Sequence, residues 1–71
     1  MKFNAQKFLT FLMDSSDTIE NDLWYDMMRD STFPKEAQTE SEIINHLKIK
    51  GACPEAKEAL IFALRRFKKS A

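Results

Sequence analysis

Apolar residues recur along the chain at the spacing of α-helices, in four segments separated by short polar stretches. In the second segment, Ile19, Leu23 and Met27 stand four residues apart, which is the spacing of one buried stripe. Trp24 and Met28 widen this stripe. The pattern therefore predicts an all-α fold in which these five side chains face the core.

The first two helices carry N-terminal capping signals. Asn4 is a good N-cap, and Phe3 and Phe8 stand at the two positions of a hydrophobic staple. We expect this first helix to run to about residue 13. Asp17 and Glu20 resemble a capping box, which predicts a second helix from there to about residue 29.

The last two helices have start and stop signals of their own. Thr39 and Glu42 form a second capping box, and Gly51 is a natural left-handed stop for the helix that they open. Ile49 is expected to pack back as this helix ends. Pro54 stands at the expected first position of a fourth helix. The remaining apolar positions expected to face the core are Phe8, Leu9, Leu12, Ile43, Ile44, Leu47, Ala56, Ala59, Leu60, Ala63, Leu64 and Phe67.

Length and composition agree with one helical domain over residues 1–71. A chain of 71 residues allows one domain, and one glycine with two prolines leaves little room for the turns of a β-rich fold. One cysteine permits no intramolecular disulfide, which fits a reducing compartment. No segment has the layout of a signal peptide or approaches the roughly 18 apolar residues of a membrane span. We therefore expect a cytoplasmic protein with no membrane contact.

An aromatic residue before a proline marks the segment between the second and third helices. Phe33 is followed by Pro34 and Lys35, and Pro34 can neither continue a helix nor leave Phe33 with helical dihedral angles. A bulky aromatic held at such a stop is expected to plug the core from outside. Phe33, Pro34 and Lys35 are thus predicted to form a structural motif.

The pattern that runs from Phe33 to Leu47 resembles the YozE-like family, small bacterial proteins with a SAM-like helical fold and no established biochemical role. Thr39 and Ile43 match that family without a gap, and Asp30 fits the acid that precedes its motif. The resemblance covers about half of the chain. It implies a compact four-helix SAM-like domain and offers no catalytic residues to carry over. The last helix departs from it, because basic residues replace the aromatic and acidic ones that the family tends to have there.

Charge is unevenly distributed, although the formal net charge is zero. Residues 14–42 carry nine acidic side chains against two basic ones, and residues 43–71 carry seven basic side chains against two acidic ones. Such asymmetry suggests a dipolar surface. Ile61 and Phe62 fall off the main apolar stripe of the last helix and form either a second contact or an exposed pair. The candidate interaction surface is therefore Lys57, Phe62, Arg65, Arg66, Lys68 and Lys69.

Two functions are open for this surface. The first is a non-catalytic protein-interaction module, whose partner is another protein or a second copy joined head to tail. This contact between acidic and basic faces would be weak and salt-sensitive. The layout resembles that of SAM-like domains, which often associate through an acidic middle surface and a basic terminal helix.

The second function is nucleic-acid binding through phosphate contacts, with a helix-turn-helix-like pair formed by the last two helices. Glu55 and Glu58 at the start of the last helix, together with the neutral net charge, weigh against it. The basic side chains could also serve only solubility and the helix dipole. The basic side chains proposed to contact nucleic acid are those of Lys48, Lys50, Lys57, Arg65, Arg66, Lys68 and Lys69.

No catalytic, cofactor or metal site is predicted, so we expect no enzyme. His46 has no partner at metal-ligand spacing and is expected to be a partly exposed structural residue. Cys53 is expected to be a small residue at a helix start, with an oxidisable surface thiol as the alternative. Asp22 and Asp26 are expected to lie on a solvated acidic face, and Tyr25 to be exposed.

Overall fold

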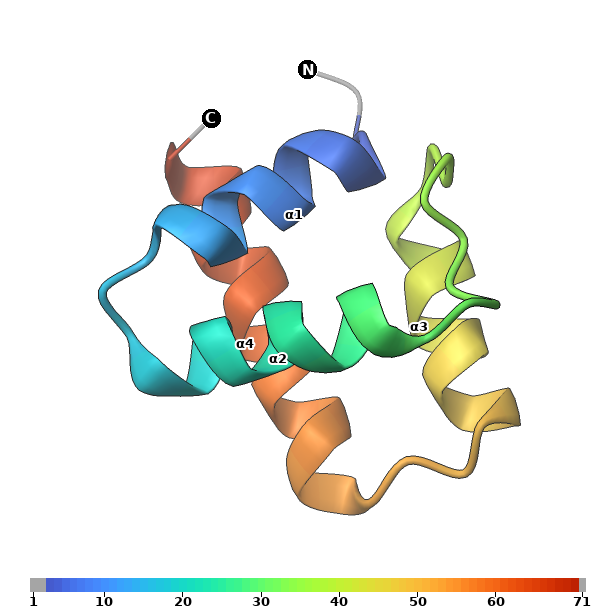
Figure 1. The fold of residues 1–71 in the computed structure, drawn as a ribbon. Helices are drawn as coiled ribbons and strands as arrows, with labels where there is room; N and C mark the ends of the chain where they lie inside the picture. The colour runs from blue at the N-terminus through green and yellow to red at the C-terminus, as the bar shows by residue number, and fades with distance from the viewer. Residues whose placement is uncertain (1–2, 71) are drawn as a thin grey trace.

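The computed structural model describes residues 3–70 and contains four α-helices. They are α1 (Ala5–Asp14), α2 (Thr18–Arg29), α3 (Glu40–Ile49) and α4 (Pro54–Ser70). The longest helix, α4, contacts each of the other three, and Figure 1 shows it crossing behind α1 and α2. Within residues 3–70 there is no strand, and no helix is long and apolar enough to cross a membrane. The predicted all-α, four-helix fold is confirmed.

Side-chain caps begin the first three helices. The Asn4 side chain accepts backbone N–H groups in the first turn of α1, and the Asp17 side chain does the same for α2. At α3 both halves of the predicted capping box form, because Thr39 and Glu42 each accept a backbone N–H from the other. At α2 only half of the predicted box forms, since the Glu20 side chain turns into the core.

The stop of α3 is the glycine that the sequence predicts. Gly51 has a φ of 72°, in the left-handed region that costs glycine little. Its N–H bonds to the carbonyl of Lys48, and the next N–H, of Ala52, bonds to the carbonyl of Leu47. These bonds satisfy carbonyls at the helix end and turn the chain toward α4.

The core lies between the four helices and includes residues of the loop between α2 and α3. Its best-buried apolar side chains come from α1, α3 and α4: Ala5, Phe8, Leu12, Ile43, Leu60 and Ala63. Four phenylalanines pack at the end where α1 meets α4: Phe3, Phe8, Phe11 and Phe67. Among them, the rings of Phe3 and Phe8 lie 5.9 Å apart at their centroids, which confirms the predicted staple.

The loop between α2 and α3 supplies core residues of its own. Phe33 is buried, as predicted, with Pro34 half-buried and Lys35 exposed. Ala37 is also buried, and its carbonyl accepts the backbone N–H of Ala5 at the start of α1. This hydrogen bond fixes the loop against α1.

Three apolar positions that the sequence pattern assigns to the core are exposed instead. Ile19 and Met28 of α2 point to solvent, because the buried stripe of α2 runs through Glu20 rather than Ile19. Ile49 is 83% exposed, since α3 ends at this residue and the chain then turns away. By contrast, Trp24 packs against the core and Tyr25 is exposed, as predicted.

Candidate interaction surfaces

Two of the basic residues near the end of α4 form ion pairs within the protein. The Arg66 guanidinium lies 3.7 Å from a carboxylate oxygen of Asp17 and 3.5 Å from one of Glu20. The Lys68 ammonium lies 2.8 Å from Glu40. These contacts tie α4 to the starts of α2 and α3, so both cations already have protein partners.

The structure brings together only part of the candidate surface. Helical spacing places Phe62, Arg65, Arg66 and Lys69 on one side of α4, because i+3, i+4 and i+7 positions share a face. Lys68 stands three residues after Arg65, at the edge of this group, where it pairs with Glu40, and Lys57 lies more than one helical turn before Phe62. Arg65 and Lys69 are exposed and have no ion pair within residues 3–70. The six candidates therefore do not form one continuous basic patch.

A hollow of about 320 Å³ lies between the start of α2 and the first half of α4. Two large apolar side chains, Ile19 and Phe62, line it with exposed fractions of 59% and 60%. The other lining residues are mostly acidic. We call this site the acidic hollow, and its residues are Asp17, Ile19, Glu20, Glu55, Glu58, Ala59 and Phe62. The sequence pattern misses it, because Ile19 is assigned to the core.

Glu20 is a buried carboxylate among the residues that line the acidic hollow, only 2% exposed. The Ser15 hydroxyl donates a hydrogen bond to Oε1, and Arg66 lies nearest to this same oxygen. The other oxygen, Oε2, is buried and has no hydrogen-bond partner in the part of the chain that the structure describes. Such an unsatisfied carboxylate oxygen is uncommon in a folded protein and costs free energy.

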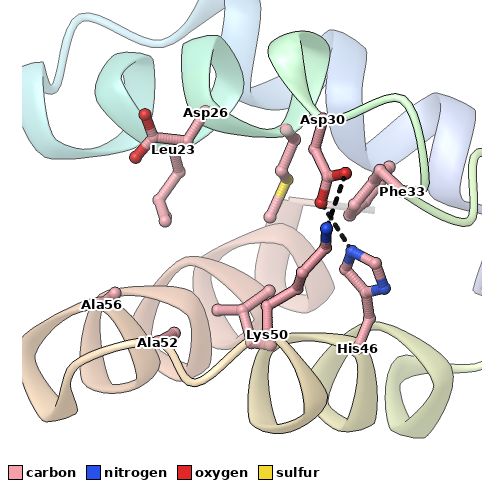
Figure 2. A pocket seen from close by; sticks show the side chains of 10 residues that line it. Leu23, Asp26, Asp30, Phe33, His46, Lys50, Ala52 and Ala56 are labelled. Atoms are coloured by element: carbon pink, nitrogen blue, oxygen red, sulfur yellow. Dashed lines mark hydrogen bonds and ion pairs between the residues drawn. The ribbon is translucent and has the colours of Figure 1, made fainter.

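A second polar cluster joins the end of α2 to α3. Figure 2 shows the side chains of His46 and Lys50 converging on the carboxylate of Asp30. His46 Nε2 lies 2.7 Å from one oxygen of this carboxylate, and Lys50 Nζ lies 3.5 Å from the other. The Thr32 hydroxyl and backbone N–H also donate to Asp30 Oδ1. The Thr32 hydroxyl, followed by His46, holds the pKa of Asp30 well below its ordinary value. At neutral pH Asp30 is thus an acceptor, and His46 Nε2 carries the proton between them.

Asp30, His46 and Lys50 also line a pocket of about 140 Å³ at the junction of α2, α3 and α4 (Figure 2). The pocket is lined mainly by apolar side chains: Leu23, Met27, Phe33, Leu47, Ala52 and Ala56. The Phe33 and His46 rings meet edge to face, 5.7 Å apart. His46 is half-buried, as predicted, but its partner Asp30 lies 16 positions away and no sequence spacing signals the pair.

The remaining candidate residues, Cys53, Asp22 and Asp26, are exposed. Cys53 is exposed, and its carbonyl accepts backbone N–H groups in the first turn of α4. Asp22 and Asp26 lie on an exposed face of α2, as predicted, where Asp26 pairs with Arg29 at 2.7 Å. Between residues 3 and 70, no group of three or more histidine, cysteine or acidic side chains is placed to hold a metal ion.

The family model for the YozE SAM-like fold matches the chain over residues 7–69. No curated protein and no solved structure matches the chain. The matched stretch covers nearly the whole chain, whereas the residue pattern alone extends over about half. It also includes α4, whose basic residues depart from the expected family pattern. The chain therefore belongs to the YozE SAM-like fold family.

Proposed function

We propose that this protein is a non-catalytic interaction module that binds another protein at the acidic hollow. One observation carries the proposal: Ile19 and Phe62, two large apolar side chains from different helices, line the same hollow while mostly exposed. Exposed apolar groups rimmed by polar residues mark interaction sites. Burying a side chain of this size in a partner contributes about 1.5–3 kcal/mol, which is enough to anchor a contact.

The second polar cluster supports a non-catalytic role. A carboxylate next to an imidazole resembles part of a hydrolase site, but the Asp30 oxygens are engaged by Thr32, His46 and Lys50. These bonds connect the end of α2 with α3, so the pair acts as a bridge between two elements. The apolar side chains that line the same pocket between α2, α3 and α4 are also consistent with a packing role for this region.

Nucleic-acid binding stays a prediction that no specific contact favours. Arg66 and Lys68, two of the cations assigned to phosphate contacts, pair with carboxylates of α2 and α3. The start of α4, which would enter a groove, contributes Glu55 and Glu58 to the acidic hollow. Self-association likewise stays a prediction, with Arg65 and Lys69 as the exposed cations that a second copy offers.

Photo-crosslinking in the cells of origin tests the proposal. We would place p-benzoyl-phenylalanine at position 62 of the full chain, and at position 25 as a matched control. Tyr25 is as exposed as Phe62 but lies outside the acidic hollow. We expect a discrete cross-linked protein from position 62 only, identified by mass spectrometry and reduced when Ile19→Ser is added. Equal products from both positions, or none from position 62, would contradict the proposal.

A further inference from the structure

We infer that the acidic hollow binds a protein segment that presents an arginine beside an apolar side chain, with the cation directed to Glu20. This inference rests on the proposed function, because it names the partner chemistry of the same site. Three observations lead to it: the charge of the hollow, the unsatisfied oxygen of Glu20, and the exposed ring of Phe62.

The charge of the hollow selects a cationic partner. Asp17, Glu20, Glu55 and Glu58 bring four carboxylates to it, and Arg66 is the one base paired with any of them within residues 3–70. A concave site lined by one sign of charge concentrates the opposite sign. An acidic segment, or a nucleic-acid phosphate, would meet like charge there and be rejected.

Glu20 supplies the specific contact. A carboxylate has two oxygens that each accept hydrogen bonds, and both neighbours of Glu20, Ser15 and Arg66, lie on Oε1. Among the described residues 3–70, Oε2 is buried without a hydrogen-bond partner. A guanidinium group that enters the hollow offers several N–H donors and completes the bonding of this carboxylate. Hydrogen bonds between charged groups are about twice as strong as neutral ones, and a buried site shields them from water.

Phe62 and its neighbours explain why the cation is an arginine with an apolar companion. The guanidinium plane stacks on aromatic rings and is more weakly hydrated than the lysine ammonium. The aliphatic stem of the arginine packs on apolar surface such as Ala59. Ile19 and the rest of the Phe62 ring then remain for the neighbouring apolar side chain of the segment.

The test begins with random linear peptides displayed on phage and selected against the full-length protein. Enriched peptides are synthesised with a fluorophore and measured by anisotropy. Each arginine-bearing peptide is paired with a version containing citrulline, which keeps the shape of arginine without its charge. The protein variants are Phe62→Ser for the apolar wall, Glu20→Gln for the carboxylate, and Glu36→Gln as a matched control. Glu36 is an exposed acid outside the hollow, so its substitution changes the net charge equally.

We expect the enriched peptides to carry arginine next to an apolar residue and to lose binding to Phe62→Ser. Their affinity should fall at least tenfold with Glu20→Gln or with citrulline, remain within twofold with Glu36→Gln, and decrease with salt. If Glu20→Gln does not fold, the citrulline peptides alone decide. Peptides that need Phe62 but bind equally well with citrulline would overturn this inference and leave the interaction module intact. If no enriched peptide depends on Phe62, the proposal that the protein binds a partner at the acidic hollow is itself wrong.

Discussion

Phe33 fills the space between the end of α2 and α3 although it belongs to neither helix. Its side chain is 6% exposed, and its ring meets the edge of His46 beside the apolar junction pocket. Backbone hydrogen bonds from Phe33 to Asp30 and from Lys35 to Phe33 hold the turn that carries the ring. One aromatic side chain from the loop between α2 and α3 thus completes the core that the helices form.

Replacing Phe33 with alanine should therefore cost about 3 kcal/mol or more, the range for truncating a buried aromatic. For a domain of this size, such a loss lowers the melting temperature by more than about 10 °C. Thermal unfolding followed by circular dichroism measures it. Tyr25→Ala, an exposed aromatic, is the control and should change stability by less than about 0.5 kcal/mol. Equal melting temperatures for wild type and Phe33→Ala would show that the ring is not core.

Asp30 should make the protein less stable in acid. Its pKa in the folded protein lies below the unfolded value of about 3.9, first because of the Thr32 hydroxyl and then because of His46. Its contribution is thus fully present above about pH 4 and is lost as pH falls toward the folded pKa. Urea unfolding should show Asp30→Asn less stable than wild type at pH 7, with the gap narrowing between about pH 4 and pH 2. Asp22→Asn, at an exposed position, is the control and should stay within about 0.5 kcal/mol of wild type at pH 7. A constant gap for Asp30→Asn would rule out the titration of Asp30 as its cause.

Residue-level burial is the part of this fold that the sequence predicts least securely. Ile19, Leu23 and Met27 are spaced as a buried stripe, yet Glu20 takes the inner position and Ile19 is exposed. The spacing i, i+4, i+8 of Ile19, Leu23 and Met27 describes one helical face, and so does the spacing i, i+3, i+7 of Glu20, Leu23 and Met27. Periodicity alone therefore does not determine how α2 is rotated about its axis. Ser15 and Arg66, which accommodate the Glu20 carboxylate, lie outside α2 and give no local signal.

At the scale of single helices, local hydrogen bonds fix the boundaries. Asn4, Asp17 and Thr39 each accept backbone N–H groups within the following three residues, so the information for a helix start is contained in a few neighbouring positions. This is why the predicted starts of α1, α2 and α3 agree with the structure. The pKa of Glu42 is also lowered, because the N–H groups of Gln38 and Thr39 bond to its carboxylate.

Removal of the α3 cap gives a prediction at this scale. Thr39→Ala deletes the hydroxyl that accepts the Glu42 N–H, and should cost about 1 kcal/mol, a typical value for an N-cap. Chemical denaturation measures the change. Ser41→Ala, an exposed hydroxyl in the first turn of the same helix, should change stability by less than about 0.5 kcal/mol. Similar losses for the two variants would mean that the cap of α3 contributes nothing specific.

At the scale of the whole molecule, charges that are far apart in the sequence meet. The uneven distribution along the chain predicts separate acidic and basic faces, but Arg66 reaches Asp17 and Lys68 reaches Glu40. These ion pairs neutralise part of the charge on each predicted face. The acidic hollow arises in the same way, since residues from the start of α2 and from α4 combine only after folding. Composition and helical spacing do not determine which distant segments of the chain come into contact.

The contact of α4 with all three other helices has a consequence for synthesis of the protein on the ribosome. Leu60, Ala63 and Leu64 supply central core positions, and they are translated after most of the surfaces that they cover. Until α4 leaves the exit tunnel, the apolar faces of α1 and α2 have no cover from it, and the nascent chain cannot complete its core. Residues 54–70 must therefore leave the exit tunnel before this core can be complete.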